Sequence, residues 1–269
     1  MRAPTVTAAA TAVLLAAAAV ACGADSAAPQ AAPPVVSAAP DVLVLRTQES
    51  RSGPAPWERG RLPDFSLYGG GRVVVPGEPA GALQTAREFR LTDREYGRRL
   101  ADAAAAGFDR NRTYEDSSGT DASQLRVALR TSKGLRTTRI TAPEAGGDGS
   151  RAKALSYVEH LPQPPRGARE FRPTALAVLA TSGVSAGSTP AVTWPLRPLA
   201  EGTLTPQGRC TILTGDALSQ ALRLARTARQ DTRWTSGDTL YAVSFRPLLP
   251  DEHACQDLSA PFNSPPQNS

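Results

Sequence analysis

Alternation of apolar and polar residues predicts several half-buried β-strands. In residues 125–129, Leu, Val and Leu alternate with Arg and Ala, a period typical of a strand with one buried face. Ser132–Gly134 can turn the chain, so we expect 135–141 to return as the second strand of a hairpin. Residues 65–68 and 73–75 flank three glycines, which tolerate the positive φ of a tight turn and predict a second hairpin. Further strands are predicted at 41–46, 174–181, 210–214 and 240–246.

Helical spacing is clearest after Thr92. Thr92 and Glu95 match a capping box, apolar residues follow at helical intervals, and Gly107 is a natural stop. Two more helices are predicted, at 151–161 and 216–229. The elements together predict an α+β fold in which antiparallel hairpins pack against two or three helices. A weak ββαββ duplication, with halves 42–161 and 170–258, is one interpretation of their order, and a generic succession of helix and strand is the other.

The first 21 residues have the build of an export signal. Arg2 supplies a positive end, Val6 to Val20 are mainly apolar, and small residues precede Cys22. The apolar run is shorter than the roughly 20 residues that span a bilayer, so we expect no transmembrane helix in the mature chain. The predicted organisation is a signal peptide (1–21), a lipidated cysteine with an Ala/Pro-rich tether (22–41), an α+β globular region (42–258) and a disordered tail (259–269).

The segment Ala19–Cys22 resembles the lipobox of bacterial lipoproteins, and the chain is similar in kind to lipoproteins of high-GC Gram-positive bacteria. The resemblance implies a lipid on the Cys22 thiol and a location at the extracytoplasmic face of the cell membrane. The pattern departs at Ala19, where Leu is common. Ala19 and Ala21 also suit ordinary signal peptidase, and that alternative predicts a secreted protein.

The cysteine count favours the lipid anchor. The chain has three cysteines, and an odd number in an exported protein leaves one thiol without a partner. If Cys22 carries lipid, Cys210 and Cys255 are left to form a disulfide in an oxidising compartment.

Charge gives one candidate binding surface. The formal net charge is only +5, which gives no indication of a nucleic-acid partner. Basic residues nevertheless crowd the hairpin predicted at 125–141. This set could contact anionic lipid headgroups or an anionic envelope polymer, although a solvated sheet face is the commoner explanation of such a run. Its members are Arg126, Arg130, Lys133, Arg136 and Arg139.

One motif suggests catalysis. Residues 183–187 match G-x-S-x-G around Ser185, and candidate acids and His253 follow in the order of α/β-hydrolases. The acids are Asp216, Asp231 and Asp238. A nucleophile elbow needs a helix directly after its serine, and Pro190 disfavours one. An envelope serine hydrolase is therefore the alternative, and a non-enzymatic structural or binding role is the prediction.

The remaining candidates are weaker. His253 lies near Cys255, but a disulfide would remove the thiolate that a metal needs, so we expect no metal and no cofactor. Trp57, Trp194 and Trp234 could stack on sugars, although core packing is the usual role of such residues. A solute-capturing transport component would need a cleft between α/β lobes, and the alternating strands argue against it. Protein partners stay open at this point.

Overall fold

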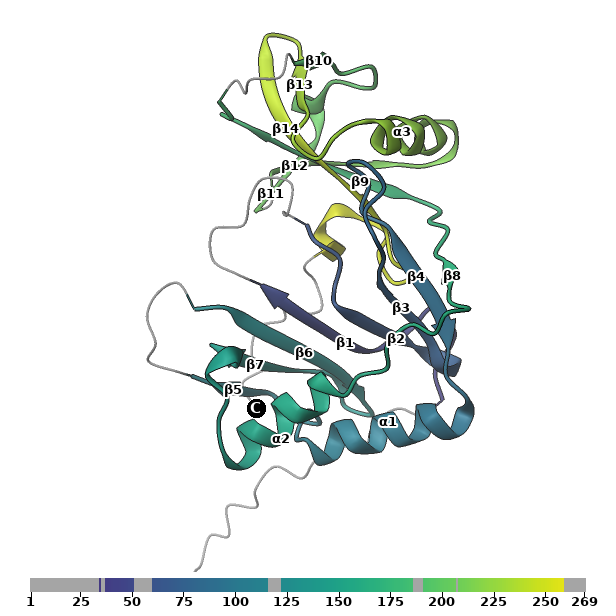
Figure 1. The fold of residues 1–269 in the computed structure, drawn as a ribbon, viewed down its shortest axis with the longest axis vertical. Helices are drawn as coiled ribbons and strands as arrows, with labels where there is room; N and C mark the ends of the chain where they lie inside the picture. Colours follow the sequence, from purple (N-terminus) through teal and green to yellow (C-terminus); the bar gives the residue numbers. More distant parts are fainter. Residues whose placement is uncertain are drawn as a thin grey trace, which may run out of the picture. The chain divides into compact units, whose positions relative to one another are not determined.

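A computed structural model gives the fold and describes residues 34, 37–50, 60–115, 122–185, 191–206 and 208–258. All of these belong to one compact unit within 31–269. The unit combines helices with two sheets (Figure 1), so the α+β prediction is confirmed at that level. Cys22 lies outside the described residues. In the part of the chain that is described, no helix is both long and apolar enough to cross a membrane.

The first sheet has eight strands in the order β5-β7-β6-β1-β2-β3-β4-β8. Neighbouring strands are antiparallel except for the parallel pair β5 and β7. Both predicted hairpins, β2–β3 and β6–β7, are confirmed. The bounds are β1 Leu43–Ser50, β2 Phe65–Tyr68, β3 Arg72–Pro76, β4 Ala86–Arg90, β5 Arg112–Tyr114, β6 Gln124–Thr131, β7 Gly134–Thr141 and β8 Arg169–Glu170.

Two helices, α1 (Asp93–Ala105) and α2 (Gly149–Glu159), supply residues to the first hydrophobic core. Leu100 of α1 and Leu155 of α2 pack there with apolar residues from β1, β2, β3, β6 and β7. The predicted capping box is confirmed, because the Glu95 amide donates to Thr92 Oγ1 and the Thr92 amide donates to Glu95 Oε2. These bonds satisfy amides that the first turn of a helix leaves without partners.

The second sheet has the order β10-β13-β14-β9-β12-β11. Helix α3 (Gly215–Thr227) contributes Leu218, Ala221 and Ala225 to the core formed with this sheet. The strands predicted at 174–181, 210–214 and 240–246 are confirmed within a few residues. The bounds are β9 Leu176–Ser182, β10 Val192–Thr193, β11 Thr203–Thr205, β12 Gly208–Leu213, β13 Arg233–Ser236 and β14 Thr239–Pro247.

The turn between β3 and β4 joins the two sheets. Leu83 forms a parallel bridge with Phe245 of β14 and packs in the second core. The Ala82 amide donates to the Ala225 carbonyl near the end of α3 at 2.8 Å. Gly81 has φ +64°, and a Cβ there would lie 2.5 Å from the Arg226 carbonyl oxygen. Only glycine fits this approach without strain.

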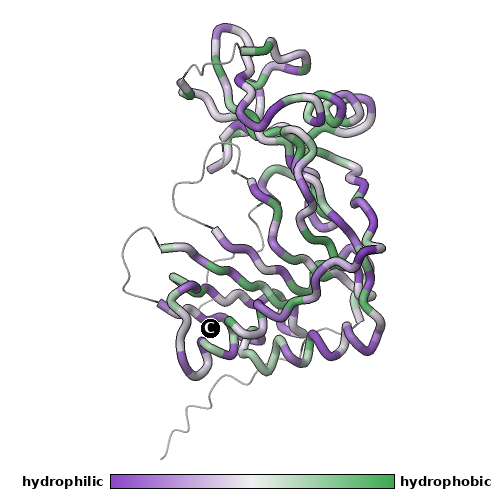
Figure 2. Tube along the Cα trace, viewed as in Figure 1, coloured by the Kyte–Doolittle hydropathy of each residue, from purple (hydrophilic) through white to green (hydrophobic). Residues whose placement is uncertain are grey.

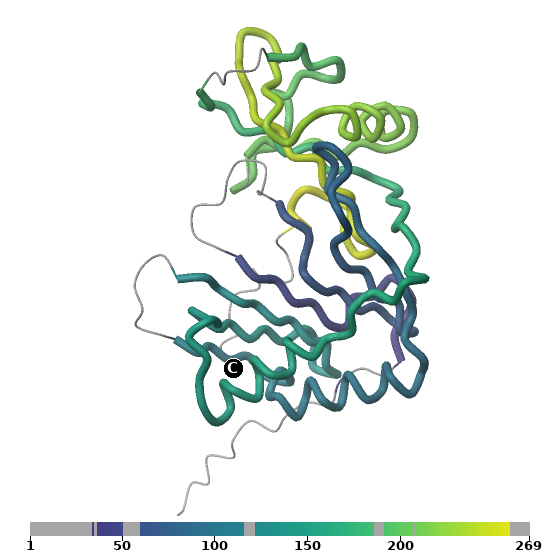
Figure 3. Tube along the Cα trace, in the orientation of Figure 1, coloured from purple at the N-terminus to yellow at the C-terminus, as the bar shows by residue number. Residues whose placement is uncertain are grey.

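The segment after β14 lies between the two sheets, as its yellow trace shows in Figure 3. Leu249 packs with the first sheet, whereas Leu248, Cys255 and Leu258 pack with the second. Figure 2 shows hydrophobic stretches, in green, along strands of both sheets. The C-terminal segment (248–258) therefore contacts both sheets.

The two sheets share a helix followed by a hairpin but differ in how that hairpin is placed. After α1, the first strand of the hairpin, β6, pairs with β1. After α3, the second strand, β14, pairs with β9. The two sheets thus share the order of helix and hairpin but not the strand pairing, and the ββαββ duplication stays a prediction.

Candidate functional site

A buried ion-pair cluster (Arg46, Arg246, Asp251 and Glu252) holds the C-terminal segment in place. Arg46 on β1 and Arg246 on β14 are 1% and 0% exposed. Glu252 accepts hydrogen bonds from Arg246 Nη1 and Nη2 at 2.6 and 2.8 Å, and lies 3.5 Å from Arg46 Nη1. Asp251 accepts a hydrogen bond from Arg46 Nη2 at 2.7 Å. Two positive charges thus meet two negative charges, as buried charges require.

The pKa of Glu252 shows how the cluster works. Burial by itself raises the pKa of a carboxyl group, but the charges of Arg246 and Arg46 outweigh it and lower the pKa of Glu252. The carboxylate therefore stays ionised at neutral pH. The cluster links β1, β14 and the C-terminal segment, and its burial suits it to holding the fold together rather than to binding a ligand.

The disulfide between Cys210 and Cys255 is present, with an S–S distance of 2.03 Å and a Cα–Cα distance of 6.0 Å. Cys210 lies on β12 and pairs in register with Leu179 of β9. The bond therefore attaches the C-terminal segment to the second sheet a few residues beyond the ion-pair cluster.

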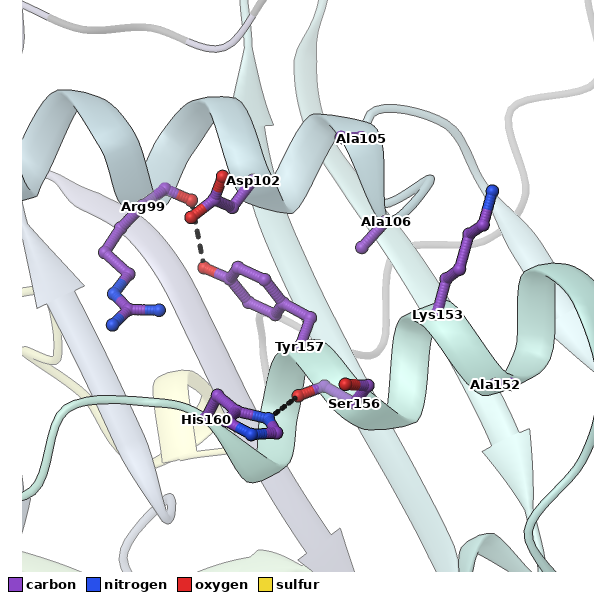
Figure 4. Close-up of a pocket in the computed structure, with 9 residues that line it drawn as sticks. All are labelled: Arg99, Asp102, Ala105, Ala106, Ala152, Lys153, Ser156, Tyr157 and His160. Atoms are coloured by element: carbon purple, nitrogen blue, oxygen red, sulfur yellow. Dashed lines mark hydrogen bonds between the residues drawn. The ribbon is translucent and has the colours of Figure 1, made fainter.

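The α1–α2 groove is an open depression of about 710 Å³ between the two helices. Figure 4 shows it with α1 along one side and α2 along the other. Its lining comprises Arg99, Asp102 and Ala105 of α1 and the adjoining Ala106, with Ala152, Lys153, Ser156 and Tyr157 of α2 and the adjoining His160.

Two hydrogen bonds fix the side chains of this groove. Tyr157 Oη donates to the Arg99 carbonyl at 3.1 Å and so ties α2 to α1. Burial raises the pKa of Tyr157, which keeps its hydroxyl protonated. His160 Nδ1 lies 2.7 Å from the Ser156 carbonyl. A carbonyl oxygen only accepts, so Nδ1 carries a proton and Nε2 is the nitrogen left for a ligand.

The structure divides the basic residues predicted on one hairpin. Arg126 and Arg139 are opposite each other in the β6–β7 register, whereas Arg136 is opposite Leu129. Because side chains alternate across a strand, Arg136 projects from the other face of the sheet. The expectation of a single five-residue patch is therefore corrected: Arg126, Arg130 and Arg139 share a face, and Arg136 does not.

Local contacts further define these side chains. Arg126 Nε donates to Gln124 Oε1, Arg130 Nε donates to the Leu43 carbonyl, and Arg136 Nη2 donates to the Lys133 carbonyl. Burial, and then the charge of Arg139, lower the pKa of Arg126. Lys133 is exposed at the hairpin turn. The hairpin thus carries positive charge at its turn and along both faces.

The hydrolase candidates are not assembled into a triad within the described residues. Ser185 is exposed three residues after β9, and its carbonyl accepts a 3.5 Å hydrogen bond from Arg233 Nε. His253 is exposed beside the disulfide, and its amide donates to Asp257 Oδ2. No hydrogen bond joins Ser185 to His253 among these residues. Residues 186–190, where an elbow needs its helix, lie outside the described ranges.

The three candidate acids of the hydrolase hypothesis lie on different elements. Asp216 lies in the first turn of α3, Asp231 forms an exposed ion pair with Arg229 at 2.9 Å, and Asp238 lies between β13 and β14. Over the described ranges, no group of three or more metal-ligating side chains comes together.

Trp194 and Trp234 belong to the second core. Their ring centroids are 5.3 Å apart in an edge-to-face arrangement, and both pack against Phe245. Their exposed fractions are 7% and 2%, which leaves no open aromatic surface for a sugar. Core packing is therefore confirmed for this pair, and Trp57 lies outside the described residues.

Comparison with protein-family models, with curated proteins and with solved structures finds no match to this chain.

Sequence reasoning missed both the groove and the ion-pair cluster. Arg46 and Arg246 each end an apolar strand pattern, and adjacent Asp251 and Glu252 were the only signal of their partners. Alanines on the outer sides of two predicted helices were the only sequence signal of the groove. Periodicity does not show which helices pack together, so the groove itself could not be predicted.

Proposed function

We propose that this protein is a lipid-anchored extracytoplasmic binding protein without enzymatic activity, and that its β6–β7 hairpin meets an anionic membrane surface. The observation that carries the proposal is a bridge between Pro34 and Thr131. Pro34 belongs to the segment that leads back to Cys22, and Thr131 adjoins the hairpin turn. Pro34 therefore lies beside the basic hairpin, which supports a path for the proposed tether that starts near this turn.

Chain length limits how far this place can lie from a lipid on Cys22. Pro34 lies twelve positions after Cys22, and a fully extended chain spans at most about 3.5 Å per residue, or about 40 Å. Lipidation would hold the hairpin within this distance of the bilayer. Electrostatic attraction to headgroups falls off within about 10 Å, so direct contact needs the turn to face the membrane.

The charge at the turn suits this orientation. Lys133 is exposed, and Arg130 and Arg136 flank it on β6 and β7. Each Lys or Arg near an anionic bilayer contributes about 1 kcal/mol to binding. A diacylglyceryl group on Cys22 would supply at least two acyl chains, which hold much better than one, so basic residues next to the anchor would mainly orient the fold against the bilayer.

Vesicle binding tests the hairpin independently of the lipid. We would use the chain from residue 22 with Cys22→Ala and vesicles with or without phosphatidylglycerol. The double variant Lys133→Gln/Arg136→Gln should lose about 2 kcal/mol, a roughly 30-fold weaker partition into anionic vesicles. Arg223→Gln/Arg226→Gln on α3 removes the same charge elsewhere and should have little effect. Equal losses in both variants would refute a specific role for the hairpin.

Measuring the binding of the same variants to poly(glycerol phosphate) distinguishes a wall polymer from lipid headgroups as the partner. Hairpin-dependent binding to the polymer but not to vesicles would assign the surface to the wall.

The anchor itself is tested by fatty-acid labelling in the native host. The wild type should incorporate label and Cys22→Ala should not, because the modification needs a thiol. Equal labelling of the two would contradict the lipoprotein assignment, and an unlabelled wild type in the culture medium would identify the secreted alternative.

A further inference from the structure

We infer that the α1–α2 groove docks an amphipathic helix of a partner protein, with small apolar residues on the docking face and acidic residues along its flanks. This inference concerns a different surface from the hairpin and does not depend on the lipid anchor.

The shape of the groove favours a helix. The lining of the groove includes the small side chains of Ala105, Ala106, Ala152 and Ser156, which leave room for a third backbone. The depression is open on the solvent side, so a small molecule would remain largely uncovered, whereas bound small ligands usually lose most of their exposed surface. An amphipathic helix lying in a groove buries its apolar face and leaves its polar face in water.

The floor of the groove is fixed before any partner arrives. The Tyr157 ring packs edge-to-face on Phe108, with centroids 5.4 Å apart, and its hydroxyl is tied to the Arg99 carbonyl. A preorganised floor lowers the entropy cost of binding.

The charges of the groove select an acidic partner. Arg99 and His160 lie toward one end and Lys153 toward the other (Figure 4), with Asp102 as the one acid in the lining. Arg99, Lys153 and Asp102 together leave the lining with a formal net charge of +1. Glutamates on both flanks of a docked helix would face Arg99 and Lys153, and complementary charge favours such encounters.

The test uses two synthetic helical peptides that share one Leu/Ala face and differ only in their flanks, Glu in one and Lys in the other. Fluorescence anisotropy would measure binding to the chain from residue 22 with Cys22→Ala, which carries no lipid. The Glu peptide should bind saturably and the Lys peptide at least tenfold more weakly. Arg99→Glu/Lys153→Glu should weaken the Glu peptide by about tenfold. Arg94→Glu changes an exposed residue of α1 outside the groove and should have no such effect.

Two tryptophan variants test the groove by steric blocking. Ala105→Trp would fill the groove and should abolish binding, whereas Ala101→Trp places the same ring on an exposed site of α1 outside it. Circular dichroism would establish that both variants fold. If Ala105→Trp fails to fold, amide shift mapping on the wild type replaces it, and shifts confined to α1 and α2 are expected.

The inference would be overturned by no saturable binding of the Glu peptide up to about 1 mM, by equal binding of both peptides, or by shifts outside the two helices. Concentration-dependent dimerisation that Ala105→Trp abolishes would instead assign the groove to a second copy of this chain, and would also overturn it.

Discussion

Replacing Glu252 with glutamine removes the negative charge that two buried arginines share. Arg246 could still donate part of its hydrogen bonding to the side-chain amide of the glutamine. Its charge would lose its main counterion, although the residue is 0% exposed. Arg46 would keep Asp251, 2.7 Å away. The perturbation therefore falls mainly on one fully buried guanidinium group.

Removing one partner of a buried ion pair typically costs about 3–5 kcal/mol, because it leaves an uncompensated charge. Glutamine is nearly isosteric and can still accept one hydrogen bond, so we expect the lower end, about 3 kcal/mol. For a domain of this size that loss corresponds to a Tm decrease of roughly 6–12 °C.

The assay is equilibrium unfolding in urea with the disulfide intact, followed by the fluorescence of buried Trp194 and Trp234. Glu201→Gln is the matched control, because Arg197 and Glu201 form an ion pair with the same 2.6 Å distance as Arg246 and Glu252. The control pair is 69% and 49% exposed, so its loss should stay below about 1 kcal/mol.

The effect of Glu252→Gln should also depend on pH. The pKa of Glu252 is lower in the folded protein than its ordinary value of 4.5, so its ionised form stabilises the fold above that value. This stabilisation is lost as the pH falls through the folded pKa. The difference between wild type and variant should therefore be constant near neutrality and narrow below about pH 4.5. Equal losses in the buried and exposed variants, or a difference independent of pH, would refute the reasoning.

Three other substitutions have defined expectations in the same unfolding assay. Cys210→Ser/Cys255→Ser opens a loop of 45 residues and should cost about 4 kcal/mol by chain entropy; a loss below about 1 kcal/mol would show that the bond adds little. Thr92→Ala removes the cap of α1 and should cost about 1 kcal/mol, whereas no change would mean that water replaces the cap. Gly81→Ala forces a left-handed φ and a contact with the end of α3, and should cost at least about 1 kcal/mol; an unchanged midpoint would mean that the turn relaxes freely.

The sequence by itself determined the main elements of this fold. Period-two alternation marked β6, β7 and β14, and the Thr92–Glu95 pattern marked the start of α1 within one residue. These signals are local, because a strand or a capped turn depends on residues only a few positions apart. The pairing of Cys210 with Cys255 was predicted from the cysteine count on the condition that Cys22 carries lipid. Short edge strands such as β10 and β11 were missed because two or three residues carry no measurable period.

Tertiary structure alone decided the candidate sites. Arg46 and Glu252 are 206 positions apart, and neither has a local pattern that identifies the other. Register placed Arg126 and Arg139 together and put Arg136 on the opposite face, and helix packing created the groove beside Tyr157. The physical reason is that these arrangements depend on which surfaces, distant in the sequence, pack against each other. A local hydrophobic pattern shows that one face of an element is buried, but it does not identify the element that covers that face.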